Sequence, residues 1–127
     1  MKRIATDEAP KAIGPYAQGV DTGSLVFCSG QVGNDPATGK VVPGGTAAET
    51  AQALANLTAV LRAAGLGLAD AVKATVYMID LREFGAMNEV YGRTMPAPYP
   101  ARATVQVAAL PAGARVEIEL VAARPGR

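Results

Sequence analysis

Residues 98–120, PYPARATVQVAALPAGARVEIEL, contain two β-patterned runs separated by the sequence LPAG. In the second run Val116, Ile118 and Leu120 alternate with charged residues, as they would in a strand with one buried face. In the first run polar and apolar residues also alternate, directly after a proline-rich approach that ends at Arg102. Charged residues make up 18% of the chain. Because they are scarce, charges inside two strands mark this stretch as a candidate site.

Two segments before this stretch have the spacing of amphipathic helices. Between Thr46 and Gly65 the apolar residues recur every three or four positions. Thr46 and Glu49 have the spacing of a capping box, in which two side chains satisfy free amides of the first turn. Residues 80–95 repeat this pattern until Pro96 prevents continuation. Both segments are therefore predicted to be helices.

The remaining segments have the alternation of strands. Residues 16–32 are predicted to form two strands around a DTG turn, and residues 71–79 to form another. A short edge strand is expected at residues 41–42. The last two strands, over residues 103–109 and 115–121, are expected to pair as a hairpin around LPAG.

The order of these elements predicts an α+β fold. One mixed sheet would carry both helices on one face, within a single domain over residues 1–127. In residues 24–31, SLVFCSGQ, both alternating sets contain apolar side chains, so part of the second face should also be buried. No third helix is available to cover it. Other copies of the chain could do so, and we expect an oligomer.

The composition excludes several classes of function. Twelve basic and eleven acidic residues give a net charge of +1, so bulk charge does not favour nucleic acid. The chain has no histidine and a single cysteine, Cys28, which leaves the common zinc sites and histidine-based catalysis without ligands or bases. The charged N-terminal segment has no apolar run, and no stretch is long enough to span a membrane. A cytoplasmic location is expected.

Arg102 and Glu117 are the leading candidates for chemistry. The guanidinium of Arg102 is a planar fork that matches a carboxylate. Glu117 could orient an attacking water molecule, and an arginine beside it would lower its pKa and make it a weak proton acceptor. Ordinary explanations remain open, because most arginines form surface ion pairs and most outward glutamates are solvated. From the residues alone the conclusion is a small α+β oligomer with a candidate carboxylate pocket.

The motifs GPY, SGQ, MNEVY, PAR and EIE, in this order over residues 8–124, resemble the RidA family of reactive-intermediate deaminases, formerly called YjgF. The resemblance implies a chorismate-mutase-like fold, in which three sheets form a central barrel with ligand clefts between subunits. It implies hydrolysis of 2-imino acids, which arise from pyridoxal-phosphate dehydratases, to 2-oxo acids and ammonia. The deaminase itself would use no cofactor and no metal.

The resemblance also implies roles for individual residues. Arg102 would clamp the substrate carboxylate, and Glu117 would act on the water that attacks the imine carbon. The other expected cleft contacts are Tyr16 as a further catalytic residue, the Ser29 hydroxyl, the Gly30 amide and Thr104, which stands where relatives carry cysteine or threonine. Met95 replaces a frequent phenylalanine and is expected to alter the pocket rim.

The predicted hairpin places Glu117 opposite Gln106, about 13 Å from Arg102 along the strand. A neighbouring subunit is therefore expected to complete each pocket. Two other functions stay open beside the deaminase. One is a non-catalytic or regulatory protein that binds small carboxylates, and the other is a translation-inhibiting endoribonuclease, for which the charge balance is unfavourable.

Overall fold

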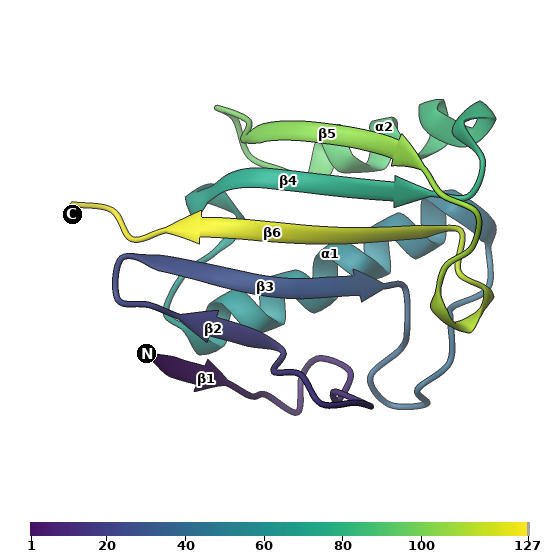
Figure 1. The fold of residues 1–127 in the computed structure, drawn as a ribbon. Coiled ribbons are helices and arrows are strands. Elements are labelled where there is room, and N and C mark those ends of the chain that lie inside the picture. Colours follow the sequence, from purple (N-terminus) through teal and green to yellow (C-terminus); the bar gives the residue numbers. More distant parts are fainter. Residues whose placement is uncertain (127) are drawn as a thin grey trace.

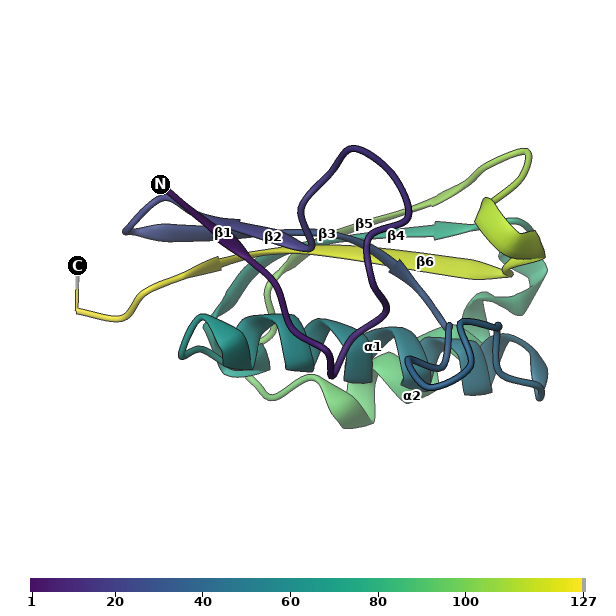
Figure 2. The same ribbon diagram turned by 90° about the horizontal axis from the view of Figure 1, so that it is seen from below.

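A computed structural model describes residues 1–126 as one six-stranded sheet with two α-helices on one face (Figures 1 and 2). The strands are β1 (Lys2–Ile4), β2 (Gly19–Asp21), β3 (Leu25–Val32), β4 (Ala71–Met78), β5 (Ala101–Gln106) and β6 (Val116–Ala123). The α-helices are α1 (Gly45–Ala63) and α2 (Phe84–Thr94), and the short 3-10 helices are η1 (Leu68–Asp70), η2 (Leu81–Glu83) and η3 (Pro111–Gly113). The predicted α+β class, the mixed sheet and both long helices are confirmed.

The last strand lies in the middle of the sheet. The strand order is β1-β2-β3-β6-β4-β5, so β6 pairs with β3 on one side and β4 on the other, antiparallel to both (Figure 1). β5 is the outer strand and runs parallel to β4. A parallel pair needs a long crossover, and α2 supplies it between these two strands.

The expected hairpin between the last two strands is therefore wrong. β4 lies between β5 and β6, and Gln106 pairs with Met78. Glu117 pairs with Tyr77 on one side and Val32 on the other. The sequence LPAG forms η3 within a connection that crosses the end of β4, so it is no tight turn. Alternation reveals which face of a strand is buried, but it carries no information about the neighbouring strand.

The core lies between the helices and one face of the sheet. Leu54, Leu57 and Leu61 of α1 are fully buried against this face, where Val76 of β4 and Ile118 of β6 are also fully buried. Burial of each such side chain contributes roughly 1.5–3 kcal/mol. This packing fixes which face of β4 and β6 remains open for other contacts.

The predicted capping box of the first helix does not form. Gly44 is the N-cap residue, and no side chain caps this end. The Thr46 hydroxyl donates instead to the Glu83 carboxylate, and Glu49 accepts from the Arg115 amide at 2.8 Å. The two side chains thus tie the start of α1 to η2 and to the start of β6. Spacing alone does not distinguish this tertiary use from a local cap.

Three further details differ from the sequence-based expectations. Residues 41–42 form no strand, and Val41 makes one isolated bridge with Asn34. Strand β1 was not predicted, because three residues are too few to show alternation. The alternation of β4 groups Val72 with the buried Ala74 and Val76, but Val72 is 47% exposed, since the pairing of β4 with β6 shifts between Ala71 and Lys73.

The face without helices carries exposed apolar side chains. Phe27 on β3 is 45% exposed and Val105 on β5 is 41% exposed. Val105 faces this side because the opposite set of residues on β5, which includes Arg102, faces the helices. The loop between β1 and β2 rises above this open face (Figure 2). Among residues 1–126 no helix combines the length and apolar character needed to cross a membrane.

Candidate active site

Arg102 is held against α2 by three side chains. It lies opposite Ala74, which is fully buried, and this register directs its side chain to the helix face of the sheet. Its Nη1 donates to Asn88 Oδ1 at 2.8 Å. Its guanidinium carbon lies 4.7 Å from the ring centroid of Tyr91 and 5.5 Å from that of Phe84. Such cation–π contacts contribute about 0.5–2 kcal/mol each and hold the guanidinium in place.

Asn88 is a site residue that the sequence analysis missed. A guanidinium can only donate hydrogen bonds, so the oxygen of Asn88 must face Arg102 and its Nδ2 donors remain available to a ligand. Both residues line a cavity of about 460 Å³. The helical spacing of Phe84, Asn88 and Tyr91, at i, i+4 and i+7, is the signal that could have revealed this group.

Two buried hydroxyls lie near Arg102. The hydroxyl oxygens of Tyr91 and Thr104 have no hydrogen-bond partner within residues 1–126. Thr104 follows Arg102 by two residues and so faces the same side of β5. Tyr91 lines the cavity, whereas Thr104 does not. Met95 is buried in the core and is not among the residues that line the cavity, so its expected effect on the pocket rim stays a prediction.

Glu117 lies on the open face, near the centre of the sheet. Its neighbours in β6, Val116 and Ile118, are fully buried on the other face. A Cβ atom added to Gly30 would lie 2.8 Å from Glu117 Oε2, so the carboxylate rests directly against this glycine. The pairing of β3 with β6 is irregular here, between Cys28 and Gln31, which brings the backbone of Gly30 under the carboxylate.

The pKa of Glu117 is raised, contrary to the sequence-based expectation. Partial burial of the carboxylate is the main cause, and the negative charge of Glu119 adds to it. The expected lowering required an arginine beside Glu117, but Arg102 lies on the other face of the sheet. A carboxylate with a raised pKa is a better proton acceptor. The structure therefore favours proton transfer by Glu117 in addition to orientation of water.

Tyr16 and Gly30 lie near Glu117. All three line a cavity of about 90 Å³, which Lys11 also lines. Tyr16 comes from the loop between β1 and β2 and is 51% exposed. The Ser29 hydroxyl donates to the Ala17 carbonyl at 2.6 Å. It therefore anchors the loop that carries Tyr16 and has no hydrogen to spare for a ligand.

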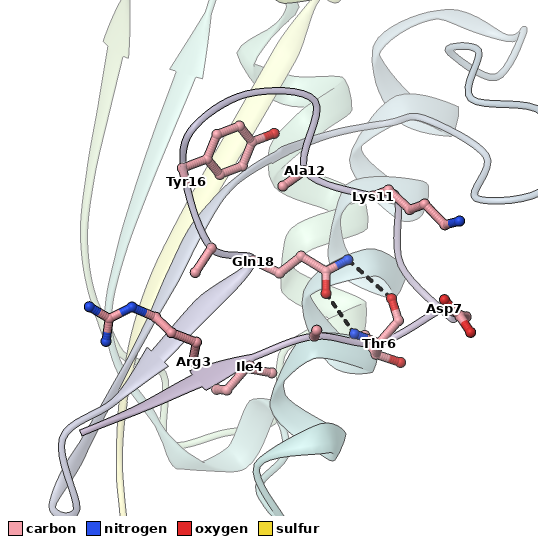
Figure 3. A pocket seen from close by; sticks show the side chains of 10 residues that line it. Arg3, Ile4, Thr6, Asp7, Lys11, Ala12, Tyr16 and Gln18 are labelled. Atoms are coloured by element: carbon pink, nitrogen blue, oxygen red, sulfur yellow. Dashed lines mark hydrogen bonds between the residues drawn. The ribbon is translucent and has the colours of Figure 1, made fainter.

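Gln18 shapes the same loop from the other side. Its amide nitrogen donates to the carbonyls of Thr6 and Pro10, and its oxygen accepts from the Thr6 amide. Figure 3 shows the two hydrogen bonds between Gln18 and Thr6, with the Tyr16 ring above them. The loop is thus fixed to the first strand by a buried side chain, which gives Tyr16 a defined position despite its exposure.

A single chain brings these residues together in two separate groups. Arg102 faces the helices, whereas Glu117 faces the open side. Their strands, β5 and β6, are separated by β4 (Figure 1). Their positions along β4 differ by three residues, or about 10 Å, and two strand spacings add about 9.6 Å across the sheet. We name them the arginine group (Arg102, Asn88, Tyr91) and the glutamate group (Glu117, Gly30, Tyr16). Within residues 1–126 no cluster of three or more His, Cys, Asp or Glu side chains could hold a metal ion.

A comparison with known protein families shows to which family this chain belongs. Residues 6–124 match the model of the family described as endoribonuclease L-PSP, which is also called the RidA or YjgF family. The chain belongs to the RidA family. A bovine member, named 2-iminobutanoate/2-iminopropanoate deaminase, is 50% identical over 121 residues, which cover 95% of this chain and 88% of the relative.

Solved structures of the RidA family share the fold. A crystal structure from Thermotoga maritima is 44% identical to this chain, has a TM-score of 0.96 and is covered over 99% of both chains. Escherichia coli TdcF with bound serine is 46% identical, with a TM-score of 0.93 and coverage of 98% of this chain and 99% of that one. The predicted membership of the RidA family is confirmed.

Proposed function

We propose that this chain is a 2-iminobutanoate/2-iminopropanoate deaminase. Its substrates would be the reactive imines and enamines that pyridoxal-phosphate dehydratases release, and its products 2-oxo acids and ammonia. The observation that carries the proposal is the 50% identity to a protein of that name over 95% of the chain. The arginine group supplies a guanidinium beside an open cavity, and the glutamate group supplies a carboxylate with a raised pKa.

In the proposed mechanism, Arg102 binds the substrate carboxylate through its remaining N–H groups, and Asn88 Nδ2 adds a donor. Each charge-assisted hydrogen bond contributes about 1.5–3 kcal/mol. Glu117 accepts a proton from a water molecule while the water oxygen forms a bond to the imine carbon. The C=N electron pair moves to nitrogen, and the resulting amine is protonated by Glu117. Glu117 then accepts the proton of the new hydroxyl group and passes it to the nitrogen, the C–N bond breaks, ammonia leaves, and the carbonyl of the 2-oxo acid forms.

The remaining predicted site residues are assigned supporting roles. Tyr16 and the backbone amide of Gly30 would contact the substrate beside Glu117, since both residues line the same cavity. Ser29 would act through the loop that it anchors. Thr104 would support Arg102 from the same face of β5. Orientation of a substrate that already reacts with water, together with one proton acceptor, suffices for the modest acceleration that this reaction needs.

We infer that the functional unit is a homotrimer with clefts between subunits. The arginine and glutamate groups lie on opposite faces of the sheet in one chain, so a shared cleft requires the arginine group of one copy and the glutamate group of another. The exposed Phe27 and Val105 on the open face supply apolar surface for such contacts. A cytoplasmic location also stays a prediction, which cell fractionation would test.

A coupled assay tests the proposed activity. A threonine dehydratase generates the imine, and the appearance of 2-oxobutanoate is followed with and without this protein. Arg102→Ala is expected to raise KM about 10- to 100-fold, the equivalent of one or two charged hydrogen bonds. Glu117→Gln is expected to lower kcat about 10²- to 10⁴-fold, the usual contribution of a positioned proton acceptor.

Matched surface variants serve as controls. Arg82 is an exposed arginine paired with Asp80, and Glu8 is an exposed glutamate paired with Arg62. Arg82→Ala and Glu8→Gln should leave the rate unchanged. Binding of 2-oxobutanoate without acceleration would instead indicate a carboxylate-binding protein. Cleavage of RNA without imine hydrolysis would indicate the endoribonuclease, which the balance of twelve basic and eleven acidic residues disfavours.

A further inference from the structure

A second carboxylate faces the same side of β6 as Glu117 and is held differently. Glu119 lies two residues further along this strand, about 6.8 Å away from Cα to Cα. Its Oε1 accepts a hydrogen bond from the Tyr77 hydroxyl at 2.5 Å. The Glu117 carboxylate accepts no hydrogen bond from any group of residues 1–126. One carboxylate of the pair is thus fixed, and the other remains available to a ligand.

The register of the strands explains how Tyr77 reaches Glu119. Tyr77 lies directly opposite Glu117 in β4, whereas Thr75 lies opposite Glu119. The Tyr77 side chain therefore leans diagonally across the strand pair, a contact that is common for long side chains in antiparallel sheets. As a result the Glu119 carboxylate is anchored toward β4 on the open face, beside the strand position of Glu117.

The other charged groups that face Glu117 come from the loop between β1 and β2 and, in the proposed trimer, from the arginine group of a neighbouring copy. From the loop between β1 and β2, Lys11 and Tyr16 line the same cavity. β3 contributes Gly30 and Val32 at this position, which do not titrate. At the start of β6, Arg115 is engaged by Glu83 at 2.8 Å.

We propose that Glu119, anchored by Tyr77, is a positioning residue whose fixed negative charge makes Glu117 a stronger proton acceptor. The inference rests on the proposed function for its catalytic meaning. A nearby like charge opposes ionisation of a carboxylate, and this agrees with the second cause of the raised pKa of Glu117. Without its anchor, Glu119 would turn toward solvent, where water screens its charge. The hydrogen bond from the Tyr77 hydroxyl would thus serve catalysis by holding the charge of Glu119 near Glu117.

The central test compares wild type with Glu119→Gln. Glutamine keeps the shape of the side chain and an oxygen that accepts from Tyr77, but it removes the charge. Carbon NMR of labelled glutamate carboxyls is expected to show a downward shift of the Glu117 pKa in this variant. The acidic limb of the pH profile of kcat/KM should move to lower pH, and the plateau should fall about threefold, because the proton acceptor is weaker.

Two further variants separate charge, anchor and general surface effects. Tyr77→Phe keeps the charge of Glu119 but removes its anchor, so it should move the Glu117 pKa in the same direction by a smaller amount. Glu89→Gln removes an exposed carboxylate on α2, which pairs with Arg93, and should change neither reading. A purely structural role of Glu119 would alter the melting temperature but leave the pKa of Glu117 in place.

The NMR titration and the activity assay distinguish failure of this inference from failure of the proposed function. An unchanged Glu117 pKa in Glu119→Gln would overturn the inference, whether or not the protein hydrolyses imines. A wild-type protein without imine hydrolysis would overturn the proposed function, yet the NMR titration would still decide whether Glu119 acts on Glu117. A lowered pKa in Glu119→Gln with no change in the pH profile would show that the coupling exists but has no part in catalysis, and this also overturns the proposal.

Discussion

At the scale of single residues, Gly30 shows how the absence of a side chain makes room for chemistry. The place of its missing Cβ atom lies 2.8 Å from Glu117 Oε2 and 3.0 Å from Glu117 Cδ. Both contacts are with the flexible end of the glutamate side chain, which can move away at little cost to the fold. Position 30 therefore controls the location of the carboxylate more than the stability of the strand.

Gly30→Ala should separate activity from stability. The added methyl group displaces the Glu117 carboxylate, so kcat/KM is expected to fall about 10²-fold, close to the effect of Glu117→Gln. The melting temperature should change by a few degrees at most. Steady-state kinetics and calorimetry on the same sample test this. Full activity in Gly30→Ala would show that Glu117 does not need its present position.

Glu117→Gln is expected to stabilise the protein at neutral pH. The folded-state pKa of Glu117 is raised above its unfolded value by burial and by Glu119. The unfolded chain therefore ionises first as pH rises, and stability falls through the window between the unfolded and folded pKa values. Glutamine at position 117 does not ionise, so this loss of stability does not occur. Its melting temperature should exceed that of wild type at pH 7, and the difference should vanish below about pH 4.

Glu8→Gln is the matched control for this measurement. Glu8 is exposed and its carboxylate lies 3.5 Å from Arg62, so its removal should give no stabilisation at any pH. A Glu117→Gln variant that is less stable than wild type at pH 7 would contradict the assigned direction of the pKa shift.

At the scale of elements, the same substitution at Gly33 has the opposite meaning. A Cβ atom at this position would lie 2.7 Å from Glu49 Cα and 2.8 Å from the Glu49 carbonyl oxygen. These are backbone atoms of α1, which cannot move aside separately. Gly33 thus sets how closely the helix approaches the end of β3.

Gly33→Ala should destabilise the fold by about 1–3 kcal/mol, the usual cost of overpacking. Denaturant unfolding measures this value, with Gly30→Ala as the matched comparison three residues away. The two variants carry the same chemical change. Equal losses of stability would contradict the distinction between a side-chain and a backbone contact.

How much of this could be predicted depends on the type of signal. Alternation of residues identified β4 and β6, and helical spacing identified α1 and α2. In each case the apolar residues of the buried face recur within the sequence of the element itself. The position of β5 beside β4 was not predictable in this way. It follows from the crossover through α2, a long-range feature that the alternation of residues 103–109 does not contain.

The prediction of the site residues was likewise limited by long-range contacts. The motif resemblance indicated Arg102 and Glu117, and the structure places Tyr16 and Gly30 with Glu117. The expected lowering of the Glu117 pKa assumed an adjacent arginine, but within one chain Arg102 lies on the other face of the sheet. Asn88 was missed because its role comes from contact with Arg102 across two elements. Contacts between different elements are thus the part of the site that local sequence patterns did not contain.

At the scale of the whole molecule, the two groups of site residues predict complementation between inactive chains. Arg102→Ala retains the glutamate group, and Glu117→Gln retains the arginine group. If each cleft takes one group from each of two subunits, mixed trimers contain some intact clefts. Random assembly of equal amounts should restore about a quarter of wild-type activity.

Co-expression of the two variants and assay of the purified mixed assembly would test this prediction. Separately purified trimers that are combined without subunit exchange serve as the control and should stay inactive. Size measurement by light scattering must give three chains for each particle. Absence of activity in a mixed trimer would place both groups of each cleft on the same chain.

The central position of β6 also has a consequence for synthesis on the ribosome. Strands β1–β3 form one part of the sheet and strands β4–β5 another, and only β6 joins the two parts by pairing with β3 and β4. Translation proceeds at about 5–20 residues per second, so the edges of β3 and β4 remain unpaired until β6 has been synthesised. During that interval each nascent chain presents two open edges that can pair with a neighbouring polypeptide. Chaperone demand should therefore be greatest just before β6 leaves the ribosome.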